Sequence, residues 1–212
     1  MTRRALSELG RKFARFATNV AVRSPRLWWF FRPLIRKQFD AIATQWDTMR
    51  DPDHLAPYEA ALRAVDGAPA RALDLGTGTG QGAFAIARRF PEAEVIGADL
   101  SERMLAEARS KTPPELDNRI RFERGDASAL PYADGAFQLV AHANMIPFFD
   151  ELARVLSPGG HALFAFSGGA ETPIYVPHER LRKELSRRGF VEFADFTAGN
   201  GTALLARKSD RI

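Results

Sequence analysis

The sequence predicts a doubly wound α/β fold: a mostly parallel, seven-stranded sheet with a C-terminal antiparallel hairpin and an N-terminal helical arm. Strand and helix patterns alternate from residue 58 onward, and a glycine-rich turn separates the first strand from the next helix. A tight-turn signal, Gly199-Asn200-Gly201, joins the last two strands. Strands that alternate with helices pair in parallel, whereas the closing hairpin adds an antiparallel strand.

Each element follows from its local pattern. Short apolar runs predict strands, and longer amphipathic runs predict helices. Ser101 is a candidate N-cap, because its hydroxyl can accept a hydrogen bond from the exposed first-turn amides. The predicted strands span residues 71–75, 94–99, 120–123, 136–141, 161–166, 191–197 and 202–207, and the predicted helices span 58–65, 80–90, 101–111, 148–156 and 178–188.

We predict that residues 1–57 form a basic and aromatic helical arm that acts as a lid. A catalytic domain at residues 58–212 follows it. Apolar residues recur at spacings of three and four over residues 3–23, which predicts an amphipathic helix. Residues 27–37 are rich in aromatic and basic side chains, and residues 38–47 predict a further helix.

The charge distribution separates the arm from the rest of the chain. Residues 1–40 hold ten Lys and Arg residues against two acidic residues, whereas residues 41–212 hold 20 basic and 24 acidic residues. Because the body of the protein is mildly acidic, nucleic acid is not an expected partner. Residues 1–37 could pack as a lid or contact a membrane peripherally, with aromatic groups at headgroup depth and cations facing anionic lipid.

Composition excludes other classes of chemistry. The chain has no cysteine, so disulfides and thiolate chemistry are excluded, and its four histidines are scattered without metal-ligand spacing. We therefore expect no metal. No apolar run reaches the ~18 residues that span a bilayer. The expected location is cytoplasmic, with possible peripheral contact at the inner face of the membrane.

The strongest functional signal is a glycine loop between the first predicted strand and its helix. Asp74-Leu75-Gly76-Thr77-Gly78-Thr79-Gly80 lets a ligand approach the main chain closely, as nucleotide sites require. Asp74 suits a positively charged ligand better than a pyrophosphate. Asp99 ends the next strand, where it could accept from ribose hydroxyls, and Asp126 follows the third strand beside an adenine amino group.

Taken in order, these motifs resemble the class I S-adenosylmethionine-dependent methyltransferases, and most closely their branch of small-molecule and quinone methyltransferases. The resemblance covers about residues 39–166, including Phe39–Asp47 near its start and Leu156–Gly160 near its end. It implies S-adenosyl-L-methionine as the cofactor and a small, lipophilic acceptor. It also implies cofactor contacts from Asp74, Gly76, Gly78, Gly80, Asp99, Leu100, Asp126 and Ala127, although Gly80 could instead permit helix packing.

The acceptor side of the site is less defined by sequence. His142, just past a predicted strand, is the candidate general base, and a structural role is an open alternative. Trp46, Tyr58 and Asn144 are candidate residues of the substrate pocket. Two other functions stay open. One is an NAD(P)-dependent Rossmann oxidoreductase, although no tyrosine in the chain heads a Tyr-x-x-x-Lys pair; the other is a non-catalytic cofactor-binding scaffold.

Overall fold

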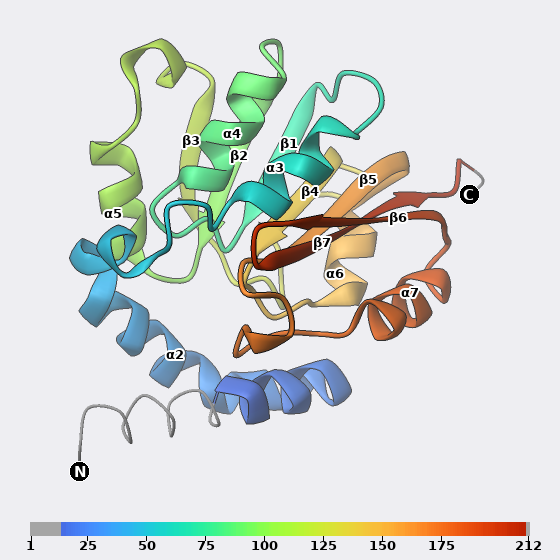
Figure 1. Ribbon diagram of the computed structural model, residues 1–212, viewed down its shortest axis with the longest axis horizontal. Helices are drawn as coiled ribbons and strands as arrows, with labels where there is room; N and C mark the ends of the chain where they lie inside the picture. The colour runs from blue at the N-terminus through green and yellow to red at the C-terminus, as the bar shows by residue number, and fades with distance from the viewer. Residues whose placement is uncertain (1–13, 211–212) are drawn as a thin grey trace.

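The computed structural model describes residues 14–210, and within them seven strands form one sheet flanked by helices on both faces (Figure 1). The predicted fold class is therefore confirmed. The strands are β1 (Arg71–Leu75), β2 (Glu94–Asp99), β3 (Ile120–Arg124), β4 (Phe137–Ala143), β5 (Leu156–Phe166), β6 (Phe190–Ala198) and β7 (Gly201–Lys208). The helices are α2 (Trp28–Ile42), α3 (Ala56–Arg63), α4 (Gln81–Arg89), α5 (Glu102–Ser110), α6 (Phe149–Val155) and α7 (His178–Ser186).

The sheet order is β3-β2-β1-β4-β5-β7-β6. The first five strands in this order pair in parallel, and β7 runs antiparallel to both β5 and β6. β1 lies at the centre, with β2 next to it on one side. After β3, the chain crosses back and adds β4 on the other side of β1. The carboxyl ends of β1 and β4 therefore form a topological switch point, where ligands of open α/β sheets bind.

Two apolar layers cover the sheet. One core cluster packs α3 and α4 against one face, and the other packs α6 and α7 against the opposite face (Figure 1). α5 begins at Ser101, which caps it as expected, because its hydroxyl accepts from the amide of Met104 at 3.1 Å.

The arm differs from its prediction in one respect. Residues 14–23 are helical, as expected, but α2 then runs as one helix from Trp28 through Pro33 to Ile42. Proline within a helix removes one backbone hydrogen bond. The helix tolerates this because Trp28 and Ile35 pack into an apolar cluster with Ile146 and Phe148, which follow β4. Residues 3–13 of the predicted first helix lie outside the described residues.

Within residues 14–210, none of the helices combines the length and hydropathy that crossing a bilayer requires. The same part of the chain contains no group of three acidic, histidine or cysteine side chains that could hold a metal ion.

Candidate functional site

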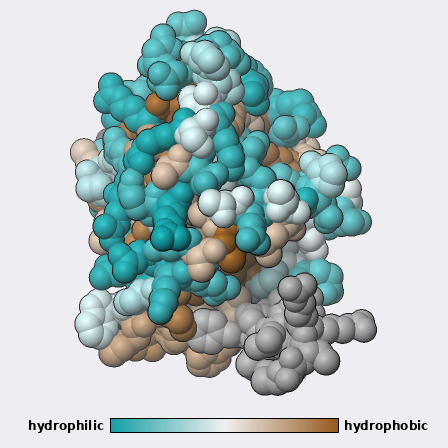
Figure 2. Space-filling view, turned by 90° about the vertical axis from the view of Figure 1, so that its left-hand side faces the viewer, coloured by the Kyte–Doolittle hydropathy of each residue, from teal (hydrophilic) through white to brown (hydrophobic). Residues whose placement is uncertain are grey.

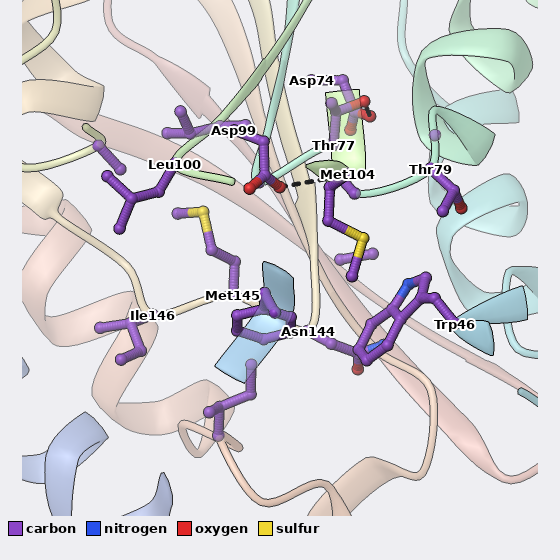
Figure 3. A pocket seen from close by; sticks show the side chains of 18 of the residues that line it. Trp46, Asp74, Thr77, Thr79, Asp99, Leu100, Met104, Asn144, Met145 and Ile146 are labelled. Atoms are coloured by element: carbon purple, nitrogen blue, oxygen red, sulfur yellow. Dashed lines mark hydrogen bonds between the residues drawn. The ribbon is translucent and has the colours of Figure 1, made fainter. Parts of the chain in front are cut away.

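A cavity opens at the carboxyl ends of the central strands, beneath the arm. Its walls come from the glycine loop after β1, the ends of β2 and β4, the loop after β3, and arm residues that include Trp28, Ile35 and Phe39. Figure 3 shows Trp46 on one side of the cavity and Leu100 and Ile146 on the other. Segments far apart in the sequence thus meet at the switch point.

The glycine loop borders this cavity through main chain that side chains would obstruct. Gly76 and Gly78 adopt left-handed backbone angles, with φ of +71° and +56°. A Cβ on Gly76 would lie 2.6 Å from Sδ of Met145, and one on Gly78 would lie 3.4 Å from Nε1 of Trp46. The two glycines therefore let the loop main chain approach Met145 and Trp46 closely.

Gly80 has a different role from the other two glycines. It is absent from the cavity wall, and an added Cβ would lie 2.9 Å from Phe84 and 3.0 Å from Phe122. Its φ of +88° and this lack of space indicate a packing role, which was the alternative left open by the sequence.

Asp74 holds the glycine loop in place through hydrogen bonds to its carboxylate. Its carboxylate accepts hydrogen bonds from the hydroxyls of Thr77 at 2.6 Å and Tyr58 at 3.1 Å, and from the amide of Ala83. Burial raises the pKa of Asp74 to about 6, although these three hydrogen bonds oppose the increase. A Cβ on Gly82, the second residue of α4, would lie 2.6 Å from this carboxylate, so glycine leaves room for it.

Asp99 is held by backbone amides at the end of β2. Oδ2 accepts from the amide of Gly78 at 2.9 Å, and Oδ1 accepts from that of Ser101 at 2.8 Å. Burial raises the pKa of Asp99, with these hydrogen bonds opposing it. The carboxylate therefore sits in a defined orientation at the cavity wall, next to Leu100.

Asp126 joins the cavity to the arm. Its Oδ1 accepts from Nε1 of Trp28, and its Oδ2 accepts from Nη1 of Arg32, both at 3.0 Å. Burial alone would raise the pKa of Asp126, but hydrogen bonds from Ser128, Arg32 and Trp28 together outweigh burial and lower it. Its neighbour Ala127 also borders the cavity.

The candidate substrate residues separate into two groups. Trp46 and Asn144 line the cavity, whereas Tyr58 is fully buried behind Asp74 and does not reach it. Asn144 adopts φ of +51°, an uncommon angle that asparagine tolerates, and its side-chain amide is bonded to Ser167 through both its nitrogen and its oxygen. The hydrogen bonds between Asn144 and Ser167 therefore hold Asn144 at the cavity wall, just after the end of β4.

His142 lies inside β4 rather than beyond its end, because the strand extends two residues further than predicted. The side chain is fully buried against the ring of Phe164, and neither ring nitrogen has a hydrogen-bond partner. Burial lowers the pKa of His142 to about 3. Since His142 does not line the cavity, this geometry gives no support to a catalytic base at that position.

Several cavity residues were not identified from the sequence. They are Trp28, Arg50, His54, Met145, Ile146, Phe148 and Ile174. Arg50 and His54 follow Trp46 in a Pro-containing loop, so their proximity to Trp46 was the available signal. The others come from the arm or from apolar positions whose orientation depends on tertiary packing.

Comparison with known proteins shows what the residues around this cavity are similar to. Residues 72–160 match a family described as "Methyltransferase domain". The chain is 41% identical over 137 residues to a demethylmenaquinone methyltransferase of Thermus thermophilus, covering 58% of this chain and 60% of that protein. It is 33% identical over 143 residues to a ubiquinone/menaquinone biosynthesis C-methyltransferase, UbiE, of Desulfotalea psychrophila, covering 62% and 57%. The chain thus spans less than two thirds of either relative.

A solved structure shows the same architecture. The structure of an S-adenosylmethionine-dependent methyltransferase from Aquifex aeolicus superposes with a TM-score of 0.65 at 16% identity, covering 78% of this chain and 97% of that one. At this identity the likeness concerns the fold.

Proposed function

Because residues 72–160 match a family described as a methyltransferase domain, we propose that this chain transfers a methyl group from S-adenosylmethionine to a small, lipophilic acceptor. One observation carries the proposal. Asp74, Asp99 and Asp126 come from the ends of three different strands, yet all border the cavity formed by the glycine loop.

The residues around the cavity fit this methyl donor. Gly76 and Gly78 line the cavity, and the carboxylate of Asp99, held by two backbone amides, would accept from ribose hydroxyls. The donor carries an ammonium and a sulfonium, so carboxylates nearby favour it. A dinucleotide would instead bring an anionic pyrophosphate toward Asp74, which is unfavourable. The carboxylate of Asp126 would face the adenine.

When bound, S-adenosylmethionine supplies a methyl group on a positively charged sulfur, which is already activated toward a nucleophile. The chain's contribution is to hold the acceptor in line and exclude water. Leu100, Met145, Ile146, Phe148 and Ile174 make an apolar wall suited to that task. The indole of Trp46 offers an aromatic face, which would stabilise positive charge beside it.

The acceptor class follows from this apolar wall and from the relatives. Two of them are named for methylation of demethylmenaquinone or for ubiquinone and menaquinone biosynthesis, and such quinones are lipophilic. An apolar cavity roofed by an aromatic arm suits an acceptor of that kind.

The proposal includes peripheral membrane contact through the arm within residues 1–37. The outward surface of its described part exposes Phe16, Trp29, Phe30 and Leu34, each more than half accessible. Between residues 14 and 39 the chain has six Arg and Lys residues and no acidic residue. Figure 2 shows hydrophobic side chains gathered at the bottom of the molecule, where Figure 1 places the arm. Basic and aromatic groups together favour an anionic lipid surface.

Calorimetry with the full chain tests the cofactor assignment. We expect micromolar binding of S-adenosylmethionine and S-adenosylhomocysteine and no binding of NAD. Binding of NAD alone would establish the oxidoreductase alternative. Binding of S-adenosylmethionine without methyl transfer from labelled donor to any lipid-extract component would favour the scaffold.

Vesicle flotation tests the membrane contact. We expect the full chain to float with phosphatidylcholine vesicles containing phosphatidylglycerol at low salt, and less so at high salt. The triple variant Trp29→Ser, Phe30→Ser, Leu34→Ser should stay at the bottom of the gradient. Val191→Ser is the matched control, because Val191 is equally exposed but lies on β6. If the unmodified chain fails to float at low salt, the membrane contact is wrong and the lid function remains.

A further inference from the structure

A second hollow, which we call the basic hollow, lies beside α2 and contains three arginines in its wall. Arg32 and Arg36 lie one turn apart on α2, and Arg124 is the last residue of β3. None of the three lines the cavity of the proposed methyl donor, although the two hollows share one wall. The residues that line the basic hollow are Arg32, Pro33, Arg36, Leu100, Arg124, Gly125 and Asp126.

The charges around the basic hollow are unbalanced. Asp126 is the one acidic residue in its wall, and Oδ2 of this carboxylate already accepts from Nη1 of Arg32 at 3.0 Å. Within residues 14–210, the side chains of Arg36 and Arg124 make no hydrogen bond or ion pair. A hollow lined by charges of one sign concentrates its field and attracts counter-ions. The basic hollow therefore favours an anion.

A phosphate group matches these donors well. Each guanidinium presents parallel N–H groups that can bind two phosphate oxygens at once. Arg36 approaches from α2 and Arg124 from β3, so two such forks border the same space. A phosphomonoester carries about −1.5 to −2 charges at pH 7 and three acceptor oxygens, which suits two unpaired guanidinium groups.

The basic hollow lies on the side of α2 that also carries an exposed indole. Trp29, Arg32 and Arg36 are spaced i, i+3 and i+7, which places them along one face of a helix. Trp29 is 63% exposed, and Phe30 and Leu34 extend the apolar surface away from the hollow. A phosphate bound there would lie next to side chains that favour the acyl chains of a lipid.

We propose that the basic hollow binds the phosphomonoester headgroup of an anionic lipid, with Arg36 and Arg124 as its principal ligands. The inference rests on the membrane contact of the proposed function, to which it adds recognition of one headgroup chemistry. Trp29 and Phe30 would contact the acyl chains of the same lipid. A soluble phosphomonoester is the other source of this chemistry, and the apolar surface beside the hollow favours the lipid.

Flotation of the full chain with two kinds of vesicle tests headgroup recognition. Both contain phosphatidylcholine, together with either phosphatidic acid or phosphatidylglycerol at mole fractions that give equal zeta potentials. General attraction between a basic surface and anionic lipid would be the same for both kinds. We expect at least about tenfold tighter binding to the vesicles with phosphatidic acid.

The double variant Arg36→Gln, Arg124→Gln should bring the ratio of the two affinities close to one. Arg32 is kept, because its bond to Asp126 anchors the arm. The matched control is Arg26→Gln, Lys37→Gln, which removes the same charge from exposed positions that do not line the hollow. The control should weaken binding to both kinds of vesicle and keep their ratio. Thermal unfolding verifies that both double variants fold, and neither should melt lower than the unmodified chain.

Addition of S-adenosylhomocysteine tests whether the basic hollow is separate from the donor cavity. Because its arginines do not line that cavity, we expect the preference for phosphatidic acid to be the same with and without this compound. A preference that S-adenosylhomocysteine abolishes would overturn the proposal and assign the arginines to the donor site.

Calorimetry with glycerol 3-phosphate identifies the source of the phosphate. This compound carries the phosphomonoester without acyl chains, so we expect much weaker binding than to the vesicles. Binding as tight as to the vesicles, and lost in Arg36→Gln, Arg124→Gln, would assign the hollow to soluble phosphate esters and overturn the lipid. If the unmodified chain floats equally with both kinds of vesicle, the basic hollow is wrong and the membrane contact stands. If it floats with neither, the membrane contact is overturned as well.

Discussion

Trp28 donates its indole hydrogen to Oδ1 of Asp126 over 3.0 Å, and this bond attaches the arm to the loop after β3. Arg32, one helical turn later, reaches the other oxygen of the same carboxylate. The carboxylate proposed to face adenine is therefore also the anchor of α2. Because the Asp126 carboxylate serves both cofactor binding and attachment of the arm, we expect a change in one to alter the other.

Trp28→Phe should loosen the arm. Phenylalanine keeps the edge-to-face packing on Phe148, but it removes the donor to Asp126. We expect the free energy of unfolding to fall by about 1 kcal/mol, below the usual range for bonds to charged groups because Asp126 keeps its other donors. Urea denaturation measures this change, and trypsin cleavage near Arg26 should become faster. Trp29→Phe is the control, since Trp29 is exposed. Equal cleavage rates in both variants would contradict the prediction.

Asp99→Ala should weaken binding of S-adenosylhomocysteine. The substitution leaves the amide of Gly78 without its acceptor and removes the group proposed for the ribose. Loss of a hydrogen-bonded charged partner costs on the order of 1.5–3 kcal/mol, which is tenfold or more in affinity. Calorimetry measures the change, with the exposed Asp117→Ala as the control. Unchanged affinity would remove Asp99 from the cofactor site.

Asp74→Asn should alter how stability depends on pH. The folded pKa of about 6 lies above the ordinary 3.8, so the folded state holds this proton more strongly than the unfolded state does. The unmodified protein should therefore lose stability, relative to the variant, as pH rises from about 4 to about 6. The difference should reach at most about 3 kcal/mol, because each unit of pKa corresponds to about 1.4 kcal/mol. Urea denaturation at several pH values tests this, and parallel curves would rule it out.

His142→Leu should remove an acid-sensitive group. The folded pKa of about 3 lies below the ordinary 6.5, so only the unfolded state takes up this proton as pH falls from 6.5 toward 3. The unmodified protein should lose stability over that interval by up to about 5 kcal/mol relative to the variant. At pH 7 the variant should be at least as stable, because two unbonded ring nitrogens are gone.

The same variant tests the role of His142 in turnover. Because the side chain does not line the cavity, we expect methyl transfer to stay within a few-fold of the unmodified rate across pH. A large fall in turnover with unchanged affinity for S-adenosylhomocysteine would instead support His142 as the general base.

The sequence by itself determined the alternation of strands and helices, the closing hairpin and the acidic residues at the strand ends. These features depend on local pattern and on chain order. The resemblance implied cofactor contacts from Asp74, Asp99 and Asp126. In the structure the three carboxylates border the same cavity, because the carboxyl ends of parallel strands meet at one edge of a sheet.

Only the tertiary structure decided which side chains reach the cavity. Tyr58 points to Asp74 behind the wall, Gly80 packs against aromatic rings, and His142 lies within β4. Because β4 extends to Ala143, His142 lies within the sheet and its side chain is buried in the core. Trp28 and Arg50 enter the site from a segment whose path depends on long-range packing of α2, which no local pattern encodes.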